Sequence, residues 1–171
     1  LNSDDWIYYF DLYKKIPEFT EQNYSMTLQE FKVIFWWEWA HRFLGRLIGI
    51  LFFIPLIIFN IKEGFRKLLN LHFIFFLICF QGFIGWYMVS SGLIDRIDVS
   101  HFRLSFHLII AFLIISLLLW NYLCLNKIKN SNINIKFSIY SFFLFLIFIQ
   151  ILIGAFVSGM DAGQIYNSWP L

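Results

Sequence analysis

Four long apolar runs, separated by short polar bands, dominate the pattern of the chain. They cover residues 39–61, 71–90, 104–125 and 137–158. Each run is close to the ~20 residues that cross ~30 Å of hydrocarbon as a helix. Because backbone polar groups in lipid must be satisfied internally, we expect helices at all four places. The predicted fold class is all-α, a polytopic transmembrane helical bundle.

Composition and charge support this interpretation. Hydrophobic residues make up 60% of the 171 residues and charged residues only 14%, against roughly 25% charged in soluble domains. The mean hydropathy is +0.69. The net charge is only +2, and no basic run is long enough to follow a phosphate backbone. We therefore expect membrane lipid around the chain and no nucleic acid as a partner.

The polar segment before the first run carries a signal for the start of a helix. Thr27 and Glu30 have capping-box spacing, which predicts a helix that begins here and enters the membrane. Trp36, Trp37 and Trp39 follow, and tryptophan favours the headgroup level. The chain begins without methionine and stops without a tail, so we expect a piece of a longer protein.

The short loops predict the orientation. Residues 62–67 hold three basic side chains and one acid, and residues 126–136 hold three lysines and no acid. Basic loops stay on the inner side of a membrane. The segment 1–38, the loop 93–101 and the chain end are therefore placed on the outer side.

One stretch, FWWEWAHRFLGRLIG at 35–49, places Glu38, His41, Arg42 and Arg46 in an apolar wall. Each ionisable group at membrane depth costs roughly 2.5–3.5 kcal/mol on insertion scales, so such groups are functional candidates. Residues three or four apart share a helix face. The third run repeats the arrangement with Arg103 and His107, four residues apart.

The topology places His41 and His107 near the same outer surface. Two imidazoles that face each other can ligate a heme iron axially, and arginines can pair with the heme propionates. Three alternatives stay open: either histidine could be an interfacial residue, Glu38 could simply pair with Arg42, and the whole could be a structural bundle. His72 and His101 are interpreted as bystanders. Cys79 and Cys124 lie in apolar runs and are interpreted as small buried side chains, without disulfide or metal.

Four stretches resemble one family. The sequence EWAHRFLGRLIG from Glu38 is similar to the signature of the heme A synthase family, of the proteobacterial and mitochondrial type. Three further blocks agree in the right order: QGFIGWYMVSSGL at 81–93, VSHFRLSFHL at 99–108, and GAFVSGMDAGQIYNSWP at 154–170. The likeness covers nearly the whole chain. A weak internal repeat, QGFIG at 81–85 and QILIG at 150–154, fits a duplicated fold.

The resemblance implies a fold of eight helices in two pseudo-symmetric bundles, of which this chain holds the second to fifth helices. Residues 1–38 would be the outer segment and the start of the first helix here, and 39–125 three helices of the N-terminal bundle. Residues 126–136 would be the inner loop, and 137–171 the first helix of the C-terminal bundle with the start of an outer loop. No cysteine lies outside the spans, unlike members with a cysteine pair in an outer loop.

The resemblance also implies a reaction, the oxidation of the C8 methyl group of heme O to a formyl group through hydroxylated intermediates, giving heme A for cytochrome oxidase. It implies His41 and His107 as axial heme ligands and Glu38 as the catalytic residue; we assign Arg42, Arg46 and Arg103 to the propionates. Heme O would be the substrate here, with heme b in the absent half. The bacterial inner membrane or mitochondrial inner membrane is the expected location. Heme O synthase, oxidase assembly factors and a second copy are candidate partners.

Two further functions remain as alternatives. A non-catalytic b-type heme domain for electron transfer needs the histidines but has no use for a glutamate on the same helix face. A structural bundle would hold no heme at all. Glu38 and the heme content therefore discriminate among the three.

Overall fold

The computed structural model describes residues 1–92, 97–125 and 137–165. The predicted inner loop at 126–136 and the last six residues lie outside these ranges. The chain divides into two compact units, Leu1–Val99 and Ser100–Leu171, and each is described by itself. All described elements are helical, and four helices are long and apolar enough to cross a membrane. The predicted all-α transmembrane fold is confirmed.

Two short helices precede the first span. Helix α1 covers Ser3–Tyr13 and α2 covers Pro17–Glu21. Sequence reasoning treated this segment only as polar and interfacial, so it missed both. The signals are present: the Asn2 side chain accepts from the Asp5 amide at 2.7 Å, and the Asp5 carboxylate accepts from the Asn2 amide at 2.9 Å. Pro17 occupies the first turn of α2, where its missing N–H costs nothing.

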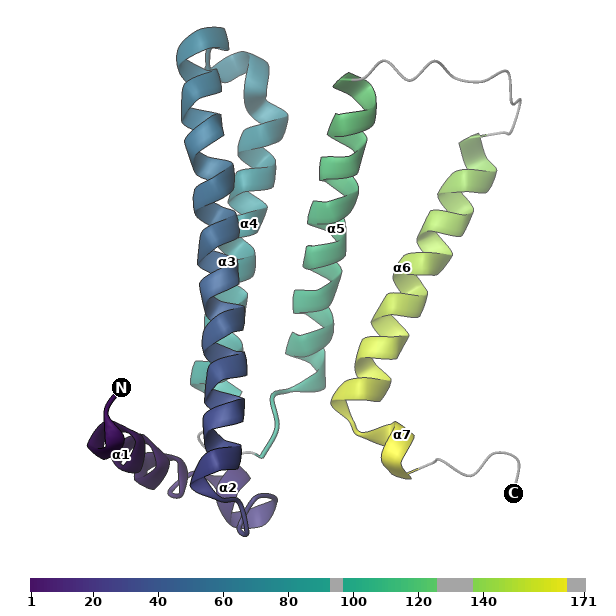
Figure 1. Cartoon of the computed structure of the whole chain (residues 1–171). Helices are drawn as coiled ribbons and strands as arrows, with labels where there is room; N and C mark the ends of the chain where they lie inside the picture. The colour runs from purple at the N-terminus through teal and green to yellow at the C-terminus, as the bar shows by residue number, and fades with distance from the viewer. Residues whose placement is uncertain (93–96, 126–136, 166–171) are drawn as a thin grey trace. The chain divides into compact units, whose positions relative to one another are not determined.

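Helices α1 and α2 lie beside the start of the third helix (Figure 1), and an aromatic core attaches them to it. Trp6 and Phe10 of α1 are buried together with Phe31. Ring centroids lie 5.2 Å apart for Phe10 and Phe31, and 5.0 Å apart for Trp6 and Phe35. These separations are within the favourable range for aromatic pairs. We call α1, α2 and the residues that they cover on the third helix the aromatic cap.

Helix α3 runs from Leu28 to Glu63. Thr27 is its N-cap: the Thr27 hydroxyl accepts from the Glu30 amide at 3.4 Å, and the Glu30 carboxylate accepts from the Thr27 amide at 2.7 Å. The predicted capping box is therefore confirmed. The helix ends at Gly64, whose φ of +83° is a conformation that glycine adopts without strain.

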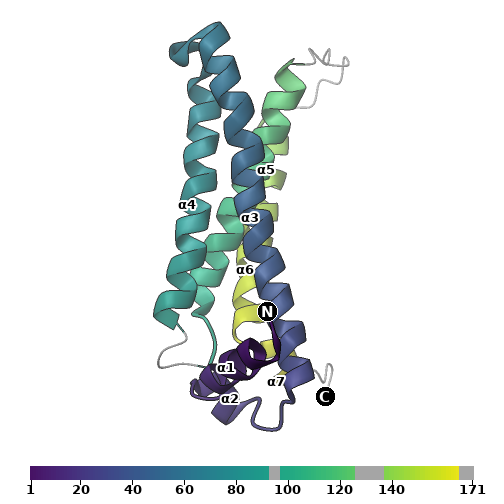
Figure 2. The same cartoon turned by 60° about the vertical axis from the view of Figure 1, so that its left-hand side comes forward.

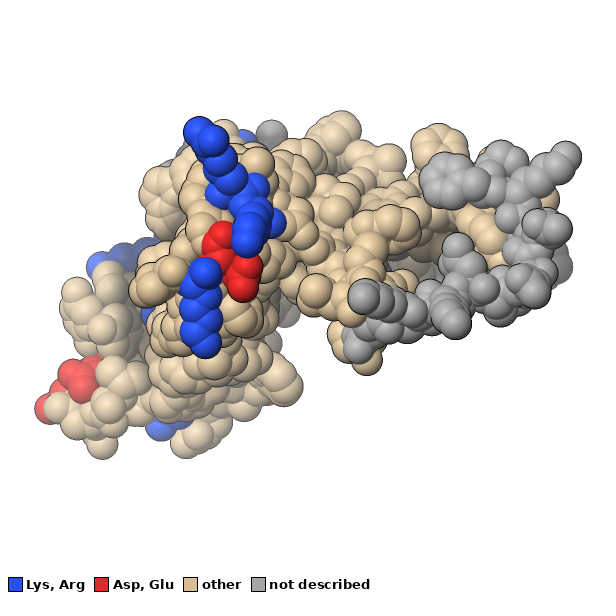
Figure 3. Space-filling view, turned by 90° about the horizontal axis from the view of Figure 1, so that it is seen from above, with Lys and Arg blue, Asp and Glu red and all other residues tan. Residues whose placement is uncertain are grey.

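A tight turn joins α3 to α4, and we call it the inner turn after the side that the sequence predicts for it. It consists of the 3₁₀ helix η1, Phe65–Leu68, and leads into α4, Leu69–Gly92. Figure 2 shows α3 and α4 running antiparallel. Figure 3, a view onto this turn, shows basic and acidic side chains close together. The exposed charged residues of the turn are Lys62, Glu63, Arg66 and Lys67. This excess of basic charge supports the prediction that the turn faces the inner side.

His72 holds the turn together. Its Nδ1 lies 2.7 Å from the Leu68 carbonyl, and its Nε2 lies 2.9 Å from the Asn60 side-chain nitrogen. Because a carbonyl only accepts, Nδ1 carries the proton and Nε2 accepts from Asn60. The Phe65 ring packs on the imidazole at 4.1 Å. Both ring nitrogens are thus engaged in structure, which supports the interpretation of His72 as a bystander.

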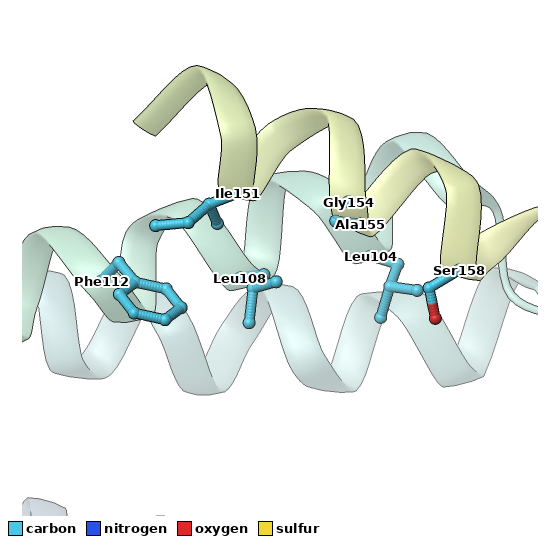
Figure 4. A pocket seen from close by; sticks show the side chains of 7 residues that line it. All are labelled: Leu104, Leu108, Phe112, Ile151, Gly154, Ala155 and Ser158. Carbon is cyan, nitrogen blue, oxygen red and sulfur yellow. The ribbon is translucent and has the colours of Figure 1, made fainter. Parts of the chain in front are cut away.

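The second unit is a helical hairpin. Helix α5 covers His101–Leu125, α6 covers Phe137–Gly159, and the short α7 covers Ala162–Ile165. An open apolar groove lies between α5 and α6 (Figure 4), lined by Leu104, Leu108, Phe112, Ile151, Gly154, Ala155 and Ser158. At the outer end the two backbones come close: a Cβ added at Gly159 would lie 3.0 Å from the His101 Cα.

This close approach predicts opposite effects for two glycine substitutions in α6. Gly159→Ala should lower stability by about 1–3 kcal/mol, because the backbone of α5 must move to admit a methyl group. Gly154→Ala is the matched control. Its added Cβ meets no atom within 4 Å, so it should raise stability by up to about 1 kcal/mol through helix propensity. Thermal unfolding in detergent measures both, and equal effects would contradict the tight contact.

The cysteine prediction was wrong in one respect. Cys79 and Cys124 are free thiols, as expected, but both are exposed rather than buried. Lipid is as apolar as a protein interior, so a small apolar side chain on a spanning helix needs no protein cover. Apolar character therefore does not report burial here.

Candidate functional site

One face of α3 carries Glu38 and Arg42 of the predicted site. Its residues recur at alternating intervals of four and three, which keeps them in line along a helix. We call this line the Glu38 face; it comprises Phe31, Phe35, Glu38, Arg42, Gly45, Gly49, Phe52 and Leu56. The aromatic cap and the inner turn lie at its two ends, so the face has an outer, a middle and an inner part.

The two ends of the Glu38 face are covered and its middle is open within the first unit. Phe31 is buried beneath the cap. At the inner end, Phe52 stacks on Phe75 of α4 with ring centroids 6.2 Å apart, and Leu56 is only 4% exposed. A Cβ added at Gly45 or Gly49 meets no atom within 4 Å. The stretch from Glu38 to Gly49 spans about 16 Å along the helix.

Glu38 and Arg42 form an ion pair at this opening. The Arg42 guanidinium donates to the Glu38 carboxylate at 2.8 Å, and both side chains are a little over half exposed. The ion pair that the four-residue spacing suggested is therefore present. An exposed pair of this kind contributes at most about 1 kcal/mol in water, so stability alone is a weak reason for placing it at an apolar wall.

His41 and Arg46 flank the face. Both side chains are exposed. Among the described residues, no hydrogen bond or ion pair engages either of them. A flat face with two small residues, an exposed imidazole and an exposed guanidinium has the donor set that a planar macrocycle with carboxylates requires. The residues present therefore fit a heme.

The predicted site residues of α5, Arg103 and His107, lie on a different face of that helix from the residues that line the groove. Arg103 and His107 line up with Ile110 and Ile114 at intervals of four, three and four, and both isoleucines are buried. His107 itself is half-buried. By contrast, the His101 ring packs between neighbouring aromatics, 4.3 Å from Phe102. This contact supports a packing role for His101.

The predicted histidine pair is divided between the two units. His41 belongs to Leu1–Val99 and His107 to Ser100–Leu171. The pairing of the two imidazoles therefore stays a prediction. The parts of the chain that the structure describes contain no cluster of three or more histidine, cysteine or acidic side chains, whereas axial heme ligation requires only two.

A polar network in the cap was missed at the sequence level. The Tyr13 hydroxyl donates to Glu18 Oε1 at 3.0 Å, and the Asn23 amide donates to the Tyr13 oxygen at 2.9 Å. Burial raises the pKa of Tyr13 to about 12; the Asn23 hydrogen bond opposes the shift, and the charges of Glu18 and Glu38 add to it. No local spacing signals this network, because it joins α1, α2 and the following loop.

The raised pKa predicts alkaline loosening of the cap. The folded pKa of Tyr13, about 12, exceeds the ordinary value of 10.0. Its stabilising contribution is therefore complete below pH 10 and is lost as pH rises toward 12. Ultraviolet difference titration should show one phenol that ionises late and that disappears in Tyr13→Phe. Tyr24→Phe, at an exposed position, is the control; a Tyr13 that titrates with the exposed tyrosines would contradict the network.

Comparisons with known proteins agree over the whole chain. A family model described as cytochrome oxidase assembly protein matches residues 1–171. The heme A synthase of Pelagibacter ubique is 52% identical over 99% of this chain and 51% of its own length. Those of Parvibaculum lavamentivorans and Rickettsia bellii are 45% and 46% identical. They align with 100% and 98% of this chain and with 51% and 52% of their own lengths. The chain thus spans about half the length of these curated relatives. No solved structure matches.

Proposed function

Because the chain belongs to the cytochrome oxidase assembly protein family, we propose that it acts as part of a heme A synthase. The reaction is oxidation of the C8 methyl group of heme O to a formyl group, which gives heme A. The observation that carries the proposal is the Glu38 face: an acid, a neighbouring histidine and two arginines border an open stretch of α3. The names of the relatives support it.

In this proposal the substrate heme lies against the open middle of the Glu38 face. His41 and His107 would hold its iron as ligands. Arg42, Arg46 and Arg103 bind the propionates through charge-assisted hydrogen bonds. Arg42 divides its donors between Glu38 and a propionate, which guanidinium's five N–H groups allow. Gly45 and Gly49 leave room for the macrocycle to approach the helix.

Glu38 moves protons. When bound, heme O supplies the methyl group that is oxidised and an iron centre that exchanges electrons. Conversion of a methyl to a formyl group also releases protons, and an ionised carboxylate beside the macrocycle accepts them. Arg42 holds Glu38 in place through the 2.8 Å ion pair. Glu38 is thus the proposed catalytic residue and Arg42 its positioning partner.

The same proposal implies a membrane location, a second heme and partner proteins. The four spanning helices make this an integral membrane protein, and the family description points to the membrane that houses cytochrome oxidase. That is the bacterial inner membrane or the mitochondrial inner membrane. Heme b would lie in the half that the relatives have beyond this chain. Heme O synthase, oxidase assembly factors and a second copy are the proposed partners.

The test uses the complete gene expressed in membranes that make heme O and not heme A. Hemes are extracted and separated by chromatography with mass detection. A new heme that carries the formyl group is the expected result. If the folded protein is present with only heme O and heme b, the synthase proposal is wrong and the electron-transfer alternative takes its place. If it contains no heme, a structural bundle is favoured.

A further inference from the structure

We propose that Tyr13, Glu18 and Asn23 form the outer section of a proton path that connects Glu38 with the aqueous phase on the outer side. The inference rests on the proposed function, because only a reaction that releases protons at Glu38 needs such a path. It gives the aromatic cap a function in the reaction. Without this path, the cap would only cover the outer part of the Glu38 face.

The cap lies on the same face of α3 as Glu38. Phe31, which the cap buries, precedes Glu38 by seven residues, or about two helical turns. The Tyr13 ring lies 5.1 Å from the Phe31 ring, centroid to centroid. Tyr13 therefore stands at the outer border of the opening that holds Glu38, with Phe35 between them along the helix.

The hydrogen bonds of Tyr13 suit transfer in one direction. A phenol has one proton to give and two lone pairs. Tyr13 gives its proton to Glu18 Oε1, and one lone pair accepts from Asn23. The second lone pair is left to accept from a water molecule, and the proposed path places that water between Tyr13 and Glu38. Asn23 Nδ2 also lies 3.4 Å from Glu18 Oε1, so the amide contacts both the phenol and the carboxylate and keeps them close together.

The transfer balances without any change in oxidation state. Protonated Glu38 gives a proton to water, and that water gives one to the Tyr13 oxygen. The original Tyr13 proton passes to the Glu18 carboxylate, which releases it to the outer aqueous phase. Tyr13 ends as it began, a neutral phenol. Only O–H bonds form and break, and the electrons of the methyl oxidation leave by another route.

Electrostatics link the two ends of the path. The charges that act on Tyr13 include Glu18 on α2 and Glu38 on α3. Asp11 of α1 is paired with Lys14, the residue after the helix, at 2.9 Å. The negative charge of Glu38 contributes to the raised pKa of Tyr13. The Tyr13 phenol and the Glu38 carboxylate are therefore coupled electrostatically.

The main test is Glu18→Gln in the complete protein. The glutamine oxygen still accepts from Tyr13, so the cap keeps its structure, but an amide cannot carry a proton at neutral pH. We expect formyl heme production to fall at least tenfold, with an altered pH profile and unchanged heme content. Glu21→Gln is the matched control, because Glu21 lies on α2, is exposed and forms no side-chain hydrogen bond or ion pair among the described residues. Tyr13→Phe, which keeps the ring, should resemble Glu18→Gln.

The outcomes separate this path from the proposed function. If the parent protein makes the formyl heme and Glu18→Gln matches Glu21→Gln at every pH, the path is wrong and the function stands. A second measurement needs no heme: the ionisation of Tyr13, followed by ¹³C NMR of labelled tyrosine and assigned by its loss in Tyr13→Phe. Glu38→Gln should lower the pKa of Tyr13, and Glu63→Gln at the inner end should not. If the pKa of Tyr13 is the same in Glu38→Gln as in the parent protein, the electrostatic coupling between Tyr13 and Glu38 is absent and the proposed path is wrong.

Discussion

Replacement of His41 by alanine in the complete protein is expected to remove the heme of the N-terminal site and, with it, the formyl product. Second-shell partners of metal ligands already contribute about 10- to 100-fold in affinity or activity, so loss of an axial ligand should exceed that range. Substitution of His107 should have the same effect. Heme content and the low-spin optical spectrum of the purified protein, together with extracted hemes, measure both losses.

The double substitution tests the pairing itself. If both imidazoles ligate one iron, they act as a unit, and the variant lacking both should lose no more than either single variant. Independent roles would instead give losses that multiply. His101→Phe is the control, because phenylalanine preserves the packing against Phe102 and Phe156. Retention of heme and product in His41→Ala would remove His41 from the site.

The elements that local patterns specify were predictable. Each of the four spans follows from a run of apolar residues, since lipid leaves helices as the available structure. The start of α3 at Thr27 and the Glu38–Arg42 pair follow from side chains three and four residues apart, within one element. Such predictions need no knowledge of how elements pack.

What depends on packing between elements was not predictable. Helix α1 has only 11 residues and buries Trp6 and Phe10 against α3; short helices are marginal by propensity and depend on such contacts. The Tyr13 network joins α1, α2 and the following loop, so it depends on how these short segments pack against one another. The proposed pairing of His41 and His107 is of the same kind, because 66 residues separate them in the sequence. Family resemblance supplied what spacing could not.

Glu38→Gln should separate binding from chemistry. The amide keeps the size of the side chain and an oxygen that can accept from Arg42, so heme should still bind through the two histidines. Formyl production should fall by roughly 10²- to 10⁴-fold, the usual contribution of a general acid or base. Heme content, optical spectrum and extracted products of the same preparation give both quantities. Glu38→Asp, which keeps the acid but shortens its reach, should retain part of the activity.

The chain contains its own control for this substitution. Glu63 and Lys67 at the inner turn form a second ion pair between residues four apart, with 3.1 Å between Lys67 Nζ and Glu63 Oε2. The Glu63 side chain is 55% exposed and the Glu38 side chain 56%. If Glu38 only contributed an ion pair, Glu63→Gln and Glu38→Gln would have similar small effects on stability and none on product. If it handles protons, only Glu38→Gln stops the reaction. An electron-transfer domain would tolerate both, because electron transfer needs the ligated iron and no carboxylate. Unchanged product in Glu38→Gln would therefore remove Glu38 from the site and leave it with the histidines and arginines.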